Sequence, residues 1–265
     1  MNRRASHSVR RVRQTIGFDN GYRLLAGMAL APVTGRPADL VFRTDGLSVS
    51  CPNRPGARVP VYEVFAEDAY RLDWFTADLG SAPVAVDIGA HIGCFTLALA
   101  QLRPGARVES YEASPATAAY TRRNVEANGL GDRVRVHQTA VSAREGFLEF
   151  PDNEGGSSLN GITAPDGTRT VQVPCVTIAQ AFASAAGQVD LVKIDTEGAE
   201  YDMVLASQTA EWAGVRRVVM EYHDVPGHSW DELEKFFDDA GLKVVASEKV
   251  SPRQGTVWLS RTALS

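Results

Sequence analysis

The sequence predicts an α/β fold in which one seven-stranded, mainly parallel sheet carries helices on both faces. Three observations support this prediction. From residue 84 onward, strand-like segments alternate with segments of helical apolar spacing; the first of these strands ends in a glycine-containing turn, VDIGAHIG; and two later strands end in charged residues. Sheets of this kind bind ligands at the carboxyl ends of their strands, where the turn and the charged residues are expected.

The strands of the sheet are expected in seven short segments rich in β-branched and aromatic residues. They span residues 84–89, 107–113, 133–141, 189–195, 216–223, 243–250 and 255–261. The last two segments are close together and are expected to form a hairpin. Five helices are expected between the strands, and several begin at a Ser, Thr or Gly that suits a helix cap. They span residues 93–102, 114–129, 177–187, 200–208 and 229–241.

The chain of 265 residues, 44% of them hydrophobic, is long enough to bury one sizeable core, which we place in residues 81–265. Residues 1–18 contain five arginines and no acid, which favours a disordered basic tail. Residues 19–80 are interpreted as an N-terminal extension. Within it, residues 40–52 fit a short hairpin, and residues 61–80 fit an amphipathic helix that packs beside the sheet and covers the ligand site.

A long polar segment interrupts the alternating pattern. Residues 151–168 are rich in Gly, Asn, Asp, Ser and Pro and separate two segments that could pair, residues 145–150 and 168–176. A loop of this length in a compact domain is either functional or a plain surface loop, and a mobile lid and a surface loop both remain open interpretations.

Composition excludes some functions. The 27 basic and 32 acidic residues give a net charge of -5, so the chain has no general attraction for nucleic acid or for an anionic membrane. No secretory signal or membrane-spanning run is visible, and we expect a cytoplasmic protein. Cys51, Cys94 and Cys175 are far apart and odd in number, which predicts reduced thiols. The oligomeric state is not indicated.

The first turn holds Gly89 and Gly93, with Asp87 two residues before the first glycine. A dinucleotide fingerprint requires a further glycine beside the pyrophosphate, and His91 stands in that place. Glu112 ends the next strand, where an acid can accept hydrogen bonds from both hydroxyls of a ribose. Together these features favour S-adenosylmethionine, which has a ribose and an amino-acid tail but no phosphate. A turn that serves only for close packing is the alternative.

The fourth and fifth strands end in a cluster of charged residues. Side chains alternate along a strand, so Lys193 and Asp195 share one face, and Glu197 joins them if the strand continues. Glu221 and His223 share a face in the same way, and His223 is expected to titrate near neutrality. A purely structural ion pair between Lys193 and Asp195 is the alternative for that pair.

At these positions the chain resembles the FkbM-type S-adenosylmethionine-dependent methyltransferases. The matching stretches are VDIGAHIGCFTLALA, YEASPATAAYTRRNVEANG, TAVS, VDLVKIDTEGAEYDMVL and VVMEYHD, within about residues 60–250. The resemblance implies a class I methyltransferase (Rossmann-like) fold, with residues 81–265 as the methyltransferase domain. It also implies methyl transfer, commonly to a hydroxyl oxygen of a secondary metabolite or a sugar. The stretch EASP departs from the EP pair usual in the family, so the local shape there can differ.

The resemblance also implies roles for single residues. Five residues of the turn would surround the methionine part of the cofactor: Asp87, Gly89, Ala90, His91 and Gly93. Glu112 would bind the ribose, and Ala140 would contact the adenine edge. Tyr70, in the preceding helix, would cover the cofactor.

For the reaction we consider two mechanisms. In the first, His223 accepts the proton of the acceptor hydroxyl, Asp195 and Glu221 orient His223, and Lys193 stabilises the charge on oxygen. In the second, which we do not favour, Asp195, Glu197, Glu221 and His223 bind a divalent metal that lowers the pKa of the hydroxyl. The acceptor is expected to be a small molecule. Two other functions are considered: a non-catalytic module that binds S-adenosylmethionine, and a nicotinamide-dependent oxidoreductase, which the missing glycine disfavours.

Overall fold

The structure is a computed structural model that describes residues 3–34, 39–54, 56–151, 170–185 and 187–264. Except for residue 151, the segment considered as a lid, residues 151–168, lies outside the described residues.

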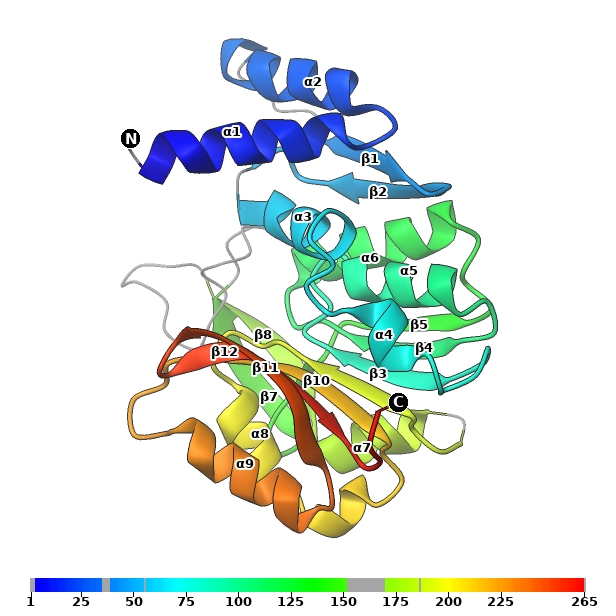
Figure 1. Cartoon of the computed structure of the whole chain (residues 1–265), viewed down its shortest axis with the longest axis vertical. Coiled ribbons are helices and arrows are strands. Elements are labelled where there is room, and N and C mark those ends of the chain that lie inside the picture. The colour runs from blue at the N-terminus through cyan, green and yellow to red at the C-terminus, as the bar shows by residue number, and fades with distance from the viewer. Residues whose placement is uncertain (1–2, 35–38, 55, 152–169, 186, 265) are drawn as a thin grey trace.

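A seven-stranded sheet forms the centre of the molecule, as predicted (Figure 1). Its strands are β3 (Val84–Ile88), β4 (Arg107–Tyr111), β5 (Val134–His137), β9 (Leu191–Ile194), β10 (Arg217–Tyr222), β11 (Lys243–Ser251) and β12 (Gln254–Ser260), in the order β11-β12-β10-β9-β3-β4-β5. Strands β5, β4, β3, β9 and β10 pair in parallel, whereas β12 is antiparallel to both of its neighbours, which confirms the predicted hairpin. The strand order reverses between β3 and β9, and ligands bind beside such a switch point.

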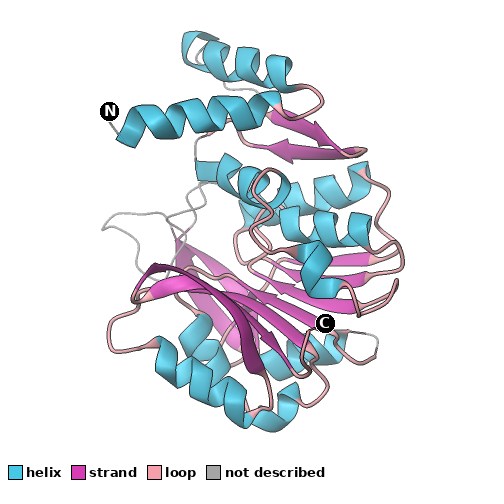
Figure 2. Cartoon of the chain, viewed as in Figure 1, coloured by secondary structure: helices cyan, strands magenta, loops and turns pink. Residues whose placement is uncertain are grey.

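Helices cover both faces of this sheet (Figure 2). One face carries α5 (Cys94–Leu102) and α6 (Pro115–Ala127); the other carries α7 (Ile178–Ser184), α8 (Glu200–Ala206), the short helix η3 (Thr209–Trp212) and α9 (Trp230–Asp239). Alternation along β3 explains the two layers, because Ala85 packs into one hydrophobic core and Val86 and Ile88 into the other. All five predicted helices are therefore present.

The predicted strand over residues 133–141 is wrong in its second half. After β5 the chain leaves the main sheet, because Ala140–Val141, which form β6, pair in parallel with β8 (Thr170–Val176). Strand β7 (Gly146–Pro151) is antiparallel to β8 and completes a separate three-stranded sheet of order β6-β8-β7. The predicted pairing of the two segments that flank the polar loop is thereby confirmed.

The expected disordered tail over residues 1–18 is instead a helix, α1 (Arg3–Ile16), followed by α2 (Gly21–Thr34). Helix α1 is held by contacts to residues far along the chain. Arg11 forms an ion pair with Glu67 at 2.9 Å, and the hydroxyl of the buried Thr15 lies 2.7 Å from that of Tyr62. Arg10 also pairs with Glu67, and the Arg11 guanidinium lies over the Tyr62 ring, so both arginines have partners that are distant in the sequence.

The extension contains the predicted hairpin, formed by β1 (Leu40–Thr44) and β2 (Leu47–Cys51), and a short helix η1 (Gly56–Arg58). The single helix expected over residues 61–80 is wrong: there are two helices, α3 (Val59–Phe65) and α4 (Leu72–Thr76). They are separated where Asp68 and Arg71 adopt φ values of 49° and 48°, a left-handed conformation that a helix cannot contain. Helix α3 packs against α5. No helix in the described ranges is both long and apolar enough to cross a membrane.

Candidate active site

A cavity of about 560 Å³ opens at the carboxyl ends of β3, β4, β9 and β10. Helix α3 and strands β6 and β7 supply further parts of its wall. Eight of the residues singled out in the sequence line it: Gly89, His91, Glu112, Ala140, Asp195, Glu197, Glu221 and His223. Five others, Asp87, Ala90, Gly93, Lys193 and Tyr70, do not contribute to the lining. The sequence therefore located the cavity but did not separate its lining from its support.

The turn after β3 requires glycine because other parts of the protein come close to it. Gly89 has φ 77°, and a Cβ atom there would lie 1.8 Å from the carbonyl oxygen of Asp195. Gly93 has φ 86°, and a Cβ atom would lie 2.9 Å from the Thr121 side chain. The turn thus has the close packing considered as its alternative interpretation, and it also forms cavity wall through Gly89 and His91.

Glu112 is held as a fixed hydrogen-bond acceptor at the end of β4. One carboxylate oxygen accepts the backbone N–H of His91 at 2.7 Å. The other accepts the backbone N–H of Ser114 and the hydroxyl of Thr117, both at 2.8 Å. Burial raises the pKa of Glu112, and these hydrogen bonds oppose that shift. The oxygen facing His91 keeps a lone pair with which it can accept a ligand hydroxyl.

Lys193 and Asp87 form a buried ion pair behind the turn. The Lys193 ammonium lies 3.4 Å from an Asp87 oxygen and 3.8 Å from Asp195, and it donates to the carbonyl of Gly89 at 2.6 Å. Burial would lower the pKa of Lys193, but Asp87 and Asp195 raise it, so the ammonium stays charged. Both Lys193 and Asp87 are buried, and neither contributes to the lining of the cavity. Their observed contacts fix β9 to the turn.

Tyr70 lies in the loop between α3 and α4, not in a helix as expected. Its hydroxyl donates to the Asp195 carboxylate at 3.3 Å, and its ring packs edge-on against Phe95. Tyr70 thus contacts Asp195 and does not contribute to the cavity lining; that it covers the cofactor stays a prediction.

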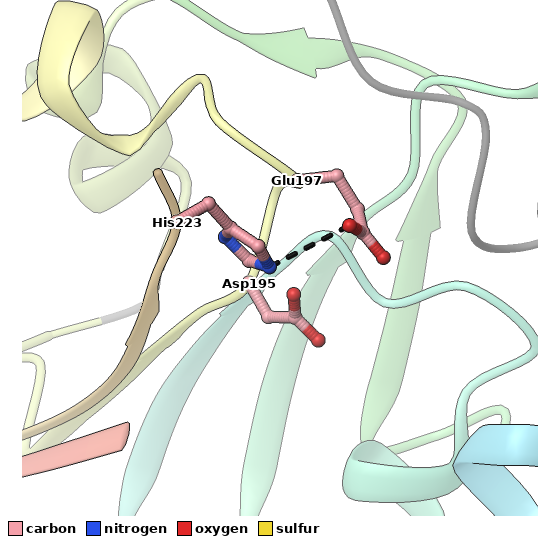
Figure 3. A group of neighbouring side chains, drawn as sticks. All are labelled: Asp195, Glu197 and His223. Carbon is pink, nitrogen blue, oxygen red and sulfur yellow. Dashed lines mark ion pairs between the residues drawn. The ribbon is translucent and has the colours of Figure 1, made fainter. Parts of the chain in front are cut away.

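His223 follows β10, and each of its ring nitrogens faces a carboxylate; Figure 3 shows the one of Glu197. Its Nε2 lies 3.5 Å from Glu197, and its Nδ1 lies 3.1 Å from Glu200, which also accepts the backbone N–H of His223 at 2.6 Å. Glu200, the first residue of α8, is fully buried. The hydrogen-bond partner that orients His223 is therefore Glu200, and not Asp195 or Glu221 as predicted.

The expectation that His223 titrates near neutrality is wrong. Burial alone would lower its pKa, but the hydrogen bond and charge of Glu200, with the charges of Asp195 and Glu197, raise the pKa to about 9. His223 is consequently a cation at neutral pH, and it must lose a proton before it can act as a base.

Three possible metal ligands meet in this cluster. Ligand atoms of Asp195, Glu197 and His223 lie within 4.8 Å of one another, whereas Glu221, the fourth residue considered, is not part of this group (Figure 3). Two oxygens and one nitrogen suit a divalent ion, but binding requires removal of the proton from His223.

Two further carboxyl groups of the cavity have strongly shifted pKa values. Burial, with the charges of Asp195 and Glu63, raises the pKa of Glu221 to about 8. Burial, with the charge of Asp195, raises the pKa of Glu63 to about 7. Glu63 lies on α3 and was missed in the sequence. The available signal was a lone acid within the apolar run VYEVF.

Comparisons with known proteins show that the chain is similar to methyltransferases. The model of the family described as the methyltransferase FkbM domain matches residues 87–244, more than half of the chain. Methyltransferase sdnD of Sordaria araneosa is 26% identical over 243 residues, which cover 80% of this chain and 91% of that protein. The 31-O-demethyl-FK506 methyltransferase FkbM of Streptomyces tacrolimicus is 27% identical over 237 residues, covering 77% and 88% of the two chains.

Two more similarities bear on the catalytic class and on the fold. The 2-O-methyltransferase NoeI of Sinorhizobium fredii is 32% identical over 162 residues, covering 54% of this chain and 64% of that one. Among solved structures, the METTL16 methyltransferase domain superposes with a TM-score of 0.53 at 14% identity, covering 92% and 81% of the two chains. The latter similarity establishes a shared fold, that of class I methyltransferases.

Proposed function

This chain belongs to the FkbM family of S-adenosylmethionine-dependent methyltransferases, and on that premise we propose that it transfers the methyl group to a hydroxyl oxygen of a small molecule. Membership of the family makes the chain a methyltransferase. Two relatives carry names that point to O-methylation, one naming 31-O-demethyl-FK506 and one naming a 2-O position, and these names support an oxygen acceptor.

The observation that carries the proposal is the division of the cavity into two chemically different ends. One end has the turn after β3 and the carboxylate of Glu112, with backbone donors already holding that carboxylate in place. We assign this end to the cofactor, with Glu112 accepting hydrogen bonds from the ribose. Ala140, on β6, lines the same cavity and is assigned to the adenine.

The other end has the imidazole of His223 and a cluster of acids. The sulfonium is already a reactive methyl donor, so this end has to hold the acceptor oxygen in line with the methyl group and remove its proton. As a cation at neutral pH, His223 takes the role that the sequence suggested for Lys193: it stabilises negative charge that develops on the acceptor oxygen. Glu200 keeps the imidazole in place.

A binding module without catalysis would have no use for the second end. Its acids Asp195 and Glu221 are half-buried close to one another, and such crowding of like charges costs stability and is common in catalytic sites. A nicotinamide-dependent oxidoreductase would need room for a pyrophosphate at the first turn, where His91 occupies the place of a glycine.

The test is to incubate the protein with S-adenosylmethionine carrying a deuterated methyl group and a metabolite extract from the source organism. The proposal predicts one or a few compounds that gain a deuterated methyl group, bound to oxygen by fragmentation mass spectrometry. Transfer to nitrogen or carbon would refute the oxygen assignment, and binding of the cofactor without any transfer would support the non-catalytic module.

A further inference from the structure

One carboxyl group of the cavity comes from outside the segment that the family model matches. Glu63 lies on α3, before residue 87, where the match begins. Val59, Pro60 and Glu63 are spaced to share one face of this helix, and all three line the cavity together with Glu221. The N-terminal extension therefore contributes an ionisable group to the site.

The Glu63 carboxyl lacks a protein partner. Within the described part of the chain its carboxyl group forms no hydrogen bond and no ion pair, and the residue is half-buried in the cavity wall. Glu67, four residues later, instead forms ion pairs with Arg10 and Arg11 and accepts a hydrogen bond from Gln14. A half-buried carboxyl group without a protein partner keeps its acceptor capacity, so a ligand in the cavity can complete the interactions of Glu63.

Other acids near the acceptor end are engaged or carry a proton. Asp195 accepts the hydroxyl of Tyr70, and Glu197 faces the His223 ring. Glu221 has no partner in the described ranges, but its pKa of about 8 leaves it mostly protonated at neutral pH. Of the two unpartnered acids, Glu63 and Glu221, Glu63 has the lower pKa, about 7, and so ionises more readily near neutral pH.

We propose that Glu63 is the catalytic residue that accepts the proton of the acceptor hydroxyl, an inference that rests on the proposed O-methyl transfer. An electron pair of the acceptor oxygen forms the new bond to the methyl carbon. The bond between that carbon and sulfur breaks, and its electron pair stays on sulfur, which gives neutral S-adenosylhomocysteine. The O–H proton moves to the Glu63 carboxylate and from there to solvent.

The charges around Glu63 suit this role. The ionisable groups that face it are Arg11 on α1, Glu67 after α3, Tyr70 in the following loop, Asp195 and Glu197 after β9, and Glu221 on β10. Burial and the acids outweigh Arg11 and raise the pKa of Glu63 to about 7. A general base is most effective when its pKa lies near the working pH, so a carboxyl group with this pKa is well matched to the task.

The experiment compares wild type with E63Q, E63D and E67Q. E63Q keeps the shape of the side chain but cannot accept the proton, E63D keeps a carboxyl group, and E67Q makes the same chemical change on a residue that does not line the cavity. Release of S-adenosylhomocysteine is measured from about pH 5.5 to about pH 8.5, a range that brackets the pKa expected of the base. The metabolite extract supplies the acceptor. Calorimetry measures S-adenosylhomocysteine binding, and thermal unfolding checks each fold.

The proposal predicts that wild-type turnover rises with pH and levels off above about 7. E63Q should lose this rise and about a hundredfold to ten-thousandfold in kcat, with unchanged affinity for S-adenosylhomocysteine. E67Q should keep the wild-type rate on the high-pH plateau and the pH-dependent rise, with the midpoint of the rise at somewhat lower pH because Glu67 is one of the acids that raise the pKa of Glu63. E63D should retain a turnover that rises with pH. If E63Q does not fold, E63D provides the test, and an E63D turnover that does not rise with pH would overturn the proposal.

Two failures can be told apart. If E63Q turns over at the wild-type rate with the same pH profile, Glu63 is not the base, and the proposed function stands. If the wild-type protein binds the cofactor but releases no S-adenosylhomocysteine with any extract fraction, the proposed function fails, and this inference fails with it.

Discussion

Replacing Gly89 with alanine tests how the first turn is coupled to the cavity. The added Cβ atom would lie 1.8 Å from the Asp195 carbonyl oxygen, which is backbone and cannot rotate away. The left-handed φ of 77° costs a non-glycine residue about 1–2 kcal/mol, and overpacking in a closed site adds about 1–3 kcal/mol. We therefore expect Gly89→Ala to lower the free energy of unfolding by roughly 2–5 kcal/mol.

Gly129→Ala is the matched control, because it measures the free-energy cost of the left-handed backbone conformation alone. Gly129 has φ 65°, and a Cβ atom there would have no atom within 4 Å. Its replacement should cost only about 1–2 kcal/mol. Urea unfolding of both variants, followed by circular dichroism, gives the difference, which is the cost of the contact with Asp195.

The same substitution should also weaken cofactor binding, because relief of the clash moves the end of β9 that carries Asp195. Calorimetry should show at least about a tenfold loss of affinity for S-adenosylhomocysteine in Gly89→Ala, equivalent to about 1.4 kcal/mol, and none in Gly129→Ala. The reasoning is refuted if the two variants are equally stable and bind S-adenosylhomocysteine equally well.

Four further predictions follow from the site. Glu112→Gln should weaken S-adenosylhomocysteine binding about tenfold or more by calorimetry, since the amide offers one acceptor oxygen where the carboxylate offers two; wild-type affinity would contradict this. Lys193→Met should lower the free energy of unfolding in urea by about 3–5 kcal/mol by leaving Asp87 buried without its cation, and adding Asp87→Asn should recover part of the loss; no recovery would argue against the ion pair. The pKa of His223 in the folded protein, about 9, exceeds its ordinary value of 6.5. The protonated imidazole should therefore stabilise the fold fully below pH 6.5, and this contribution should disappear as the pH rises through 9. A difference in unfolding free energy between wild type and His223→Gln that stays constant over this range would contradict the assignment. Turnover should survive exhaustive chelation, and a loss that Mg²⁺ restores would support the metal alternative.

The sheet could be predicted because its signals are local. Strand β3, the helix that follows it and the β11–β12 hairpin each have a hydrophobic pattern, and each pairs with a neighbour that the alternating order specifies. The division of residues 133–141 between two sheets was not predictable in this way, because it depends on the pairing of Ala140 with Cys175, which lies far along the chain.

The N-terminal region shows the same limit. Five arginines without acids suggest a solvated tail when only the local sequence is considered. Helix α1 is ordered by Glu67, which lies more than fifty residues away, and by the burial of Thr15. A cluster of arginines indicates a folded segment only when the residues that pair with the arginines are known.

In the site, motifs identified the residues but not their contacts. The stretch KIDTEGAE contains the buried Lys193 as well as Glu200, yet only the fold shows that Lys193 lies behind the turn and that Glu200 holds His223. The protonated state of His223 likewise follows from carboxylates brought together by β9, α8 and β10. Glu63 was missed because the helix that carries it has no recognisable motif.

The central claim is that the cavity beside the first turn selects a sulfur-containing nucleoside without phosphate, S-adenosylmethionine or its demethylated product. Isothermal titration calorimetry of the full chain with S-adenosylmethionine, S-adenosylhomocysteine and NAD tests it most directly. The account predicts saturable binding of the first two ligands and none of NAD. Saturable binding of NAD, without any binding of the two sulfur nucleosides, would contradict it.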